Sequence, residues 1–338
     1  MTLLITQEII ERSFSIEMAI PVIEETFRMA GEGSTENPPR FVMPTEEGFL
    51  RFGAAALRDR KVMGFKLWAN FGSGAAQSWN YLFSLETGEL LAILHAYSLG
   101  RFRTSATTAV AAKYLSRSDA SSVGIYGTGR LAEAQLRAIK AVRPIERVKA
   151  YSRTPKSREA FCKEVSGRLG IEIAPATTPE EVPQGADMIV TITNSHAPVL
   201  FGKWMARPAL VLAIGANQWY EREIDDDIVR QAKLVVVDNK GQAKTEGGDL
   251  LWAAAHGHLN WDRVRELGEI VTGRVPVPDL NTDMILFESH GIAIEDVAVS
   301  AEMYRIAREK GLGEEINLNL GKARSEVLSP GVDVAVRR

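Results

Sequence analysis

The chain has 338 residues, of which 45% are hydrophobic and 25% are charged, and its formal net charge is −3. A single hydrophobic core usually stops growing at about 250–300 residues, so this length favours two domains. The weakly acidic balance argues against nucleic-acid binding, which needs clustered Lys and Arg. The single cysteine, Cys162, excludes a disulfide framework and any multi-cysteine metal site.

The N-terminal segment has neither a basic region nor a long apolar run, so we do not expect a signal peptide. No stretch of about 18 apolar residues is present, and such a run is what a membrane helix needs. His256 and His258 have no third ligand nearby in the sequence, and we predict no metal. We therefore expect a cytoplasmic protein with no membrane segment and no nucleic-acid partner.

The first 118 residues predict helices combined with a mostly antiparallel sheet. Ser15 is a good N-cap for a helix whose apolar residues recur every three or four positions, with Pro21 inside it and Gly31 and Gly33 at its end. A second helix, rich in small residues, is predicted at about 104–115, with Arg103 at its start. Short apolar runs predict strands at 41–43, 49–56 and 62–68, and a hairpin at 81–85 and 90–94.

From residue 121 strands and helices alternate, which predicts a doubly wound parallel sheet. Helices are expected up to about 142, at 157–169 and, as an amphipathic helix, at 293–310. Strands are expected at 123–126, 147–151, 171–174, 187–193, 209–214, 234–238 and 284–287. The predicted fold class is α/β, with a Rossmann domain at 119–299 and a second, α+β domain formed by 1–118 together with about 300–338.

The strongest local pattern is a glycine-rich turn between a strand and a helix. Residues 127–132 read Gly-Thr-Gly-Arg-Leu-Ala, the G-x-G-x-x-A form of the dinucleotide fingerprint. Gly127 makes the tight turn, Gly129 lets the backbone approach a pyrophosphate, and Ala132 lets the helix pack on the strand. The free N–H groups of the helix N-terminus then favour phosphate. We predict that Gly127, Thr128, Gly129, Arg130 and Leu131 bind a nicotinamide dinucleotide.

The end of the second Rossmann strand indicates which dinucleotide is preferred. Enzymes that prefer NAD place an Asp or Glu there to bond the ribose 2′-hydroxyl. This chain instead has Ser152, Arg153 and Thr154, with Lys156 nearby. We therefore predict NADP(H) in preference to NAD(H), with NAD(H) still possible. The alternative is that Arg153 is only a solvated surface charge.

Three basic residues occupy unusual settings in the first domain. Arg40 follows two prolines, Lys66 lies in an apolar strand between Phe65 and Leu67, and Arg103 opens a helix. A buried Lys is costly unless its charge is matched, and an Arg fork suits a carboxylate. The three residues predict a shared site for an anionic ligand. The alternative is an alternating strand whose polar face happens to carry Lys66.

At this point the chain resembles the ornithine cyclodeaminase/mu-crystallin family. The matching segments extend over roughly residues 35–315 and occur in the family's order. They are Gly-Phe-Lys at 64–66, Arg-Thr-Ser-Ala at 103–106, Ala-Ala-Lys-Tyr-Leu at 111–115, Gly-Thr-Gly at 127–129, Thr-Ile-Thr-Asn-Ser at 191–195, Gly-Ala-Asn at 215–217, Arg-Glu-Ile-Asp at 222–225 and Ser-His-Gly-Ile-Ala-Ile-Glu-Asp-Val at 289–297.

The resemblance implies NAD(H) or NADP(H) binding, a homodimer formed through the first domain, and action on amino acids or imines. It implies that Arg40, Lys66 and Arg103 hold the substrate carboxylate. It also implies that Thr191, Thr193, Asn194 and Ser289 lie near the cofactor.

One departure from the family concerns residue 217. The cyclodeaminases carry an Asp there that engages the substrate amines, whereas this chain has Asn217. A neutral amide can hydrogen-bond the substrate but cannot balance an ammonium group. Asn217 is therefore a candidate substrate-binding residue, and ornithine is disfavoured as substrate.

These features predict an NADP(H)-dependent oxidoreductase that reduces an imine, or oxidises the amine, of a small α-amino or imino acid. Lys66 is our candidate proton donor, and His290 is a weaker one. Two alternatives stay open. One is a cyclodeaminase-type lyase that uses NAD+ catalytically and releases ammonia. The other is a non-catalytic protein that binds NADPH or a small ligand.

Overall fold

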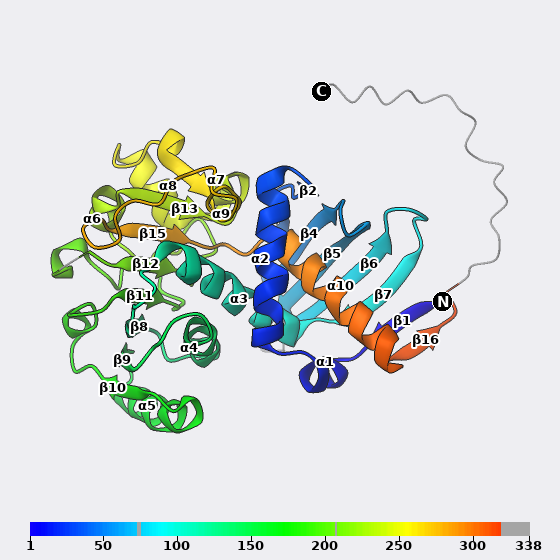
Figure 1. Cartoon of the computed structure of the whole chain (residues 1–338), viewed down its shortest axis with the longest axis horizontal. Coiled ribbons are helices and arrows are strands. Elements are labelled where there is room, and N and C mark those ends of the chain that lie inside the picture. The colour runs from blue at the N-terminus through cyan, green and yellow to red at the C-terminus, as the bar shows by residue number, and fades with distance from the viewer. Residues whose placement is uncertain (73–75, 207, 319–338) are drawn as a thin grey trace.

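The computed structural model describes residues 1–72, 76–206 and 208–318, and its strands form two eight-stranded sheets that lie side by side (Figure 1). The predicted fold class is confirmed, because one sheet is all-parallel and the other is mixed. Within the described part of the chain, no helix has the length and apolar character needed to cross a membrane.

The first sheet has the strand order β16-β1-β7-β6-β5-β4-β2, and β3 also pairs with β4. Its pairings are antiparallel except for that between β1 and β7. The strands are β1 (Thr2–Ile5), β2 (Thr35–Glu36), β3 (Phe41–Pro44), β4 (Gly48–Leu57), β5 (Val62–Phe71), β6 (Gln77–Ser84), β7 (Leu90–His95) and β16 (Glu314–Ile316). The sequence analysis missed β1 and β16, which close one edge of this sheet.

Four helices belong to this half of the molecule: α1 (Gln7–Ser13), α2 (Ile16–Glu32), α3 (Tyr97–Leu115) and α10 (Ala293–Lys310). The Ser15 hydroxyl accepts from the Met18 N–H and Gly33 ends α2 with a φ of 80°, as predicted, and the helix runs on through Pro21. Helix α3 begins well before the predicted position, so Arg103 lies inside it rather than at its start.

Helix α10 lies across one face of the first sheet and contacts β4, β5 and β6 (Figure 1). Its bounds agree with the prediction, but its amphipathic character does not, because residues 293–300 are buried on every side. The two-domain division at 118 and about 300 remains a prediction, and residues 319–338 of it lie outside the described residues. Within the described chain, the packing of α10 against the first sheet begins at Ala293, before the predicted boundary at about 300. The Cβ of Ala293 lies 3.4 Å from the Cβ position of Gly53.

The second sheet is parallel throughout, with the strand order β10-β9-β8-β11-β12-β15-β13-β14. The chain proceeds outward from β8 to β9 and β10, and then returns to β11 on the other side of β8. Ligands bind at such a reversal in doubly wound sheets. The strands are β8 (Ser122–Tyr126), β9 (Arg147–Tyr151), β10 (Glu172–Pro175), β11 (Met188–Thr191), β12 (Leu210–Ala213), β13 (Leu234–Val237), β14 (Val264–Glu266) and β15 (Ile285–Glu288).

The helices of this half cover both faces of the sheet. They are α4 (Ala132–Lys140), α5 (Pro155–Leu169), α6 (Asp226–Gln231), α7 (Lys240–Glu246), α8 (Gly248–Ala255) and α9 (Leu267–Val271), with 3₁₀ turns η1 (Pro179–Glu181), η2 (Gly202–Trp204) and η3 (Trp261–Arg263). The halves meet where α2 packs on α9. A Cβ on Gly31 would lie 2.2 Å from the Gly268 carbonyl oxygen, so the two backbones touch only because these residues are glycines.

Candidate functional site

The turn after β8 has the geometry of a phosphate-binding loop. Gly127 has a φ of 103°, and a Cβ there would lie 2.4 Å from the Ile192 carbonyl oxygen. No atom lies within 4 Å of the Cβ position of Gly129, which lines an open groove. Ala132 is fully buried at the start of α4. Gly127 therefore shapes the turn, and Gly129 leaves room for a pyrophosphate at the helix N-terminus.

The groove has a volume of about 740 Å³ and runs past the ends of β8, β9, β11 and β12. Thr191 is not at its surface, because that side chain is buried and its hydroxyl donates to Glu223. Ser289 lines the neighbouring cavity instead. The groove collects ten of the predicted cofactor residues: Gly127, Thr128, Gly129, Arg130, Leu131, Ser152, Arg153, Thr154, Thr193 and Asn194.

The end of β9 is held by Arg158, which follows this strand together with Arg153. Arg158 donates to the Ser152 carbonyl oxygen at 2.7 Å and lies over the Tyr151 ring at 5.1 Å. The Thr128 hydroxyl donates to that of Ser152 at 2.8 Å. Arg153 is exposed at the groove wall. In the described chain, Glu221 is the acidic residue that lines this groove, and it follows β12 rather than β9.

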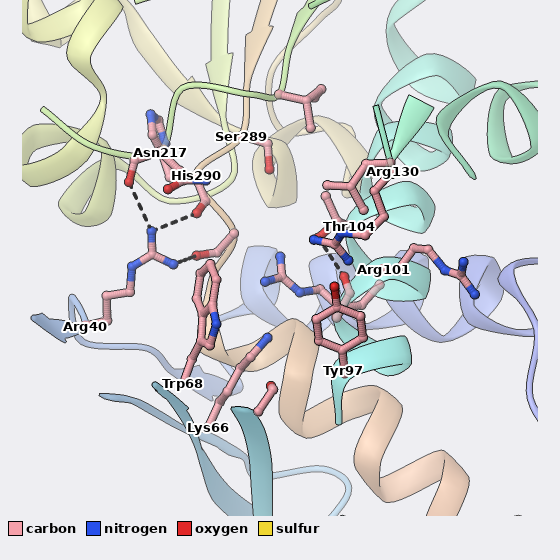
Figure 2. Close-up of a pocket in the computed structure, with 16 residues that line it drawn as sticks. Arg40, Lys66, Trp68, Tyr97, Arg101, Thr104, Arg130, Asn217, Ser289 and His290 are labelled. Carbon is pink, nitrogen blue, oxygen red and sulfur yellow. Dashed lines mark hydrogen bonds between the residues drawn. The ribbon is translucent and has the colours of Figure 1, made fainter. Parts of the chain in front are cut away.

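A second cavity, of about 120 Å³, adjoins the groove and is lined by Arg40, Lys66 and Arg103. Figure 2 shows Arg40, Trp68 and Lys66 reaching from the first sheet toward the other half of the molecule. The structure thus brings together three cations that lie far apart in the sequence. The cavity and the groove share five lining residues: Trp68, Arg130, Leu131, Ile214 and Asn217.

Each of these three cations already has a protein carboxylate beside it. Lys66 Nζ lies 3.0 Å from Asp296 Oδ1, which also accepts from Arg103 Nε at 3.2 Å. Arg103 Nη1 donates to Glu295 at 2.8 Å. The burial of Lys66 therefore does not by itself require an anionic ligand. The sequence analysis gave Glu295 and Asp296 no role of their own, although they belong to the 289–297 segment that carries the resemblance.

Arg40 is held between the two halves of the molecule. Its guanidinium pairs with Glu246, with Nε 2.9 Å from Oε1, and donates to the His290 carbonyl oxygen at 3.1 Å (Figure 2). Its backbone N–H donates to the Gln242 side chain at 3.0 Å. Arg40 thus lies at the contact between the two halves of the molecule, with its guanidinium group fixed in place.

Burial and neighbouring charges shift the pKa values of this cluster. Burial lowers the pKa of Lys66, and the charge of Arg103 lowers it further, although Asp296 opposes the shift. Burial alone would raise the pKa of Asp296, but Arg103 and Lys66 hold it below its usual value. Burial raises the pKa of Glu295 to about 8 against the pull of Arg103, so that carboxyl is mostly protonated at neutral pH.

Asn217 follows β12 and faces both cavities. Its Oδ1 accepts from Arg51 Nη1 at 3.1 Å, and its backbone N–H donates to Glu221 at 3.0 Å. The sequence analysis missed Arg51. This residue lies in the 49–56 run, which we identified by its apolar residues alone.

Glu223 holds two loops of the groove in register. Its carboxylate accepts from the backbone N–H and hydroxyl of Thr193, from the Thr191 hydroxyl, and from the backbone N–H groups of Gly215 and Ala216. The side chain is fully buried, and burial raises its pKa in spite of these bonds. The Arg-Glu-Ile-Asp segment contributed to the resemblance, but only the structure shows what its glutamate does.

Asp238 holds the loop after β15 in the same way. It accepts from the Ser289 hydroxyl at 3.0 Å and from the N–H groups of His290 and Gly291, each at 2.7 Å. The His290 ring is fully buried and lies 2.9 Å from Glu288. Burial alone would lower the pKa of His290, but bonds to Asp238 and Glu288 raise it to about 10. The ring is a buried cation between two acids, which favours a structural role over proton donation.

Comparison with known proteins places the whole arrangement in one group. The model of the ornithine cyclodeaminase/mu-crystallin family matches residues 1–311. An alanine dehydrogenase from Archaeoglobus fulgidus is 33% identical over 323 residues, which cover 93% of this chain and 98% of that protein.

Solved structures agree with this result. The Delta(1)-pyrroline-2-carboxylate reductase of Thermococcus litoralis, in complex with NADH and L-proline, is 30% identical with a TM-score of 0.88, covering 93% of this chain and 100% of that chain. An archaeal alanine dehydrogenase dimer with bound NAD is 32% identical with a TM-score of 0.88, covering 94% and 99%.

We predict that Glu223→Gln weakens the groove without removing any residue that lines it. The Gln amide nitrogen would face N–H and hydroxyl donors, and each unsatisfied buried donor costs about 1–3 kcal/mol. We expect the free energy of unfolding to fall by about 2–4 kcal/mol and the affinity for the dinucleotide to fall about tenfold. Thermal unfolding and fluorescence titration measure both quantities. Glu181→Gln, at a carboxylate outside the groove that accepts from the Thr177 N–H, is the control, and equal effects in both variants would refute the role of Glu223.

Proposed function

The chain belongs to the ornithine cyclodeaminase/mu-crystallin family, and from this premise we propose an NAD(P)-dependent oxidoreductase that acts on a small α-amino or imino acid. It reduces an imine or, in reverse, oxidises the amine. The observation that carries this proposal is the continuity of two cavities. The groove with the glycine turn and the cavity with the three cations share Asn217, Trp68 and Ile214.

The groove fits a nicotinamide dinucleotide. Gly129 leaves open space where a side chain would block a pyrophosphate, and α4 begins directly behind it. When bound, the reduced nicotinamide supplies a hydride. The balanced reaction is imine plus NAD(P)H plus one proton giving amine plus NAD(P)+. The protein's contribution is therefore to orient the substrate and to supply that proton.

Arg40, Lys66 and Arg103 are the residues proposed to hold the substrate carboxylate. Their hydrogen bonds to Glu246, Asp296 and Glu295 fix the cations before any ligand arrives. Because burial raises the pKa of Glu295 to about 8, its carboxyl compensates the charge of Arg103 less than an ordinary glutamate would, which leaves the cluster open to a substrate carboxylate. Such fixed charges orient the bound acid with little reorganisation.

Lys66 is the proposed proton donor. Its ammonium lines the cation cavity, and its lowered pKa makes it a stronger acid than an ordinary lysine. Protonation of the imine nitrogen makes the carbon a better hydride acceptor. Asp296 keeps the ammonium in place and restrains the fall in its pKa.

The position of Arg51 supports the exclusion of diamines. Its guanidinium lies 3.1 Å from Asn217, at the position where the cyclodeaminases are expected to carry an aspartate. A cation there repels a substrate ammonium. An aspartate introduced at 217 would pair with Arg51 rather than stay available to an amine.

The proposal is tested by following NADPH absorbance with a set of 2-oxo acids plus ammonia or methylamine, and with cyclic imino acids. We expect loss of NADPH in wild type. Lys66→Met should lower kcat/KM by about 10²–10⁴, the usual size of a general acid effect. Lys61→Met, which changes an exposed lysine just before β5, is the control.

A change below threefold in Lys66→Met would remove Lys66 from the mechanism. Ammonia release from an amino acid without net cofactor consumption would identify the lyase instead. NADPH binding with no turnover of any substrate would identify the non-catalytic binding protein.

The preference for NADP(H) is the second part of the proposal. Arg153 is exposed at the groove wall beside Ser152, and no acid follows β9 there within the described chain. The Arg153 fork suits a 2′-phosphate. An acid that would repel such a phosphate is absent from this part of the described groove.

We expect a kcat/KM ratio of NADPH over NADH above one in wild type. Arg153→Ala should lower this ratio by about 10–100-fold, because hydrogen bonds to charged groups are worth about 1.5–3 kcal/mol. The control is Arg147→Ala, at the exposed start of the same strand. A wild-type ratio below one would overturn the preference.

The third part of the proposal is a homodimer formed through the first sheet. Helix α10 covers one face, while Phe52, Met63 and Phe65 lie on the other, where a hollow of about 340 Å³ is lined mainly by apolar residues. Phe52 is 38% exposed and Met63 is 37% exposed. A contiguous apolar patch of this kind on a sheet face favours coverage by another protein surface.

Light scattering of the wild type should give twice 37.1 kDa at micromolar concentration. Phe52→Glu should shift the protein toward the monomer, with at least a tenfold rise in the dissociation constant, since it introduces a charge into an apolar interface. Trp219→Glu, at a residue 68% exposed elsewhere, is the control. A monomeric wild type would refute the dimer.

A further inference from the structure

Arg51 is a buried cation that lacks the partner its neighbours have. It lies on β4, paired in register with Trp68 on β5, and is 4% exposed. Its guanidinium is 4.5 Å from the Phe49 ring centroid and 5.1 Å from that of Trp68. Its one hydrogen bond among the described residues goes from Nη1 to the Asn217 amide, and Nε has no acceptor.

The other three cations of the site differ from Arg51 because each has an acidic partner. Arg40, Lys66 and Arg103 are each within 3.2 Å of a protein carboxylate. No carboxylate of the described residues forms an ion pair with Arg51, although Glu246 and Glu221 act on it through their charges. Burial lowers the pKa of Arg51 to about 10, and Arg40 adds to that shift. A buried guanidinium with a single neutral acceptor is costly, so its free N–H groups are poised for an external anion.

The position of Arg51 decides which anion can reach it. Arg51 lines a small cavity of about 30 Å³ together with Arg40, Lys66 and Arg103. It also lines the groove beside Asn217. Arg51 therefore lines both the small cavity at the cation cluster and the groove, with its guanidinium beside Trp68. A substrate held by its α-carboxylate at that cluster can extend toward Arg51.

We propose that Arg51 binds a second acid group on the substrate, so that the enzyme acts on an α-imino or α-amino dicarboxylate. This rests on the proposed function, since it specifies the substrate of the same site. The two aromatic rings hold the guanidinium plane, and the free N–H groups can take a carboxylate. The neutral Asn217 leaves the Arg51 charge uncompensated, whereas an aspartate at 217 would cancel it.

The charge of the site agrees with two acid groups. The cluster of Arg40, Lys66 and Arg103 lies beside protein acids, whereas Arg51 forms no ion pair within the described chain. An α-carboxylate bound at the cluster leaves Arg51 without a counter-ion. A second carboxylate on the same substrate supplies one.

The experiment compares oxaloacetate with pyruvate, each with the same concentration of ammonium, in NAD(P)H oxidation. We expect a kcat/KM ratio above ten in favour of oxaloacetate in wild type. Arg51→Met should lower this ratio by about 10²-fold, the effect of losing a charge-assisted contact. Arg51→Lys, which keeps the charge but not the fork, should lower it less. Arg58→Met, at an exposed arginine just beyond the same strand, should leave the ratio unchanged.

Titrations of the NAD(P)+ complex with L-aspartate and L-alanine provide a readout that does not need turnover. If no oxo acid is reduced, the proposed function fails, while tighter L-aspartate binding that disappears in Arg51→Met still supports the subsite. Equal kcat/KM of wild type for oxaloacetate and pyruvate overturns the subsite. An Arg51→Met variant that keeps the wild-type ratio but binds NAD(P)H more weakly also overturns it, because Arg51 would then serve the cofactor.

Discussion

The site depends on one buried carboxylate, that of Asp296, placed between Lys66 and Arg103. These residues come from α10, β5 and α3, which are brought together only by the fold. Isolated charges cannot be buried without partners, so the three elements must pack in this register or leave an unpaired ion inside the protein. The register also fixes where the remaining N–H groups of the two cations point, which is into the cavity beside the groove.

Buried carboxylates also hold the loops of the half that contains the parallel sheet. Glu223 joins the loops after β11 and β12, and Asp238 gathers the N–H groups of the loop after β15. Both carboxylates are buried and act on backbone as well as side chains. Loops that form a ligand site are usually mobile unless such bonds hold them. Here acidic residues fix the loops that line the groove and the neighbouring cavity, while the basic residues face the space for the substrate.

The sequence predicted the parts of this site whose chemistry is local. Gly127 and Gly129 were identifiable because a turn of that shape needs glycine at those positions. Arg40, Lys66 and Arg103 were noticeable because charges stand out against apolar neighbours. The bounds of α10 followed from its apolar pattern and from Gly311.

The missed features depend on distant partners. Strands β1 and β16 pair residues from opposite ends of the chain, so neither strand's neighbours in sequence reveal it. Helix α3 was predicted to start at about 104, whereas it begins at Tyr97 and includes Gly100. A Cβ on Gly100 would lie 3.2 Å from Lys66 Nζ, so this glycine gives the ammonium its space. Arg51 was overlooked because an arginine in an apolar strand resembles an edge residue until its burial is known.

The pairing of Arg40, Lys66 and Arg103 with protein acids raises the question of why their cavity still attracts an anion. Full pairing would make the cluster neutral and remove the long-range attraction for an acid. The raised pKa of Glu295 opposes this, because a protonated carboxyl can bond Arg103 without cancelling its charge. Burial in α10 is the cause of that raised pKa. The same packing that orders the cations therefore also weakens their compensation by protein acids, and the substrate site follows from the way one helix is buried.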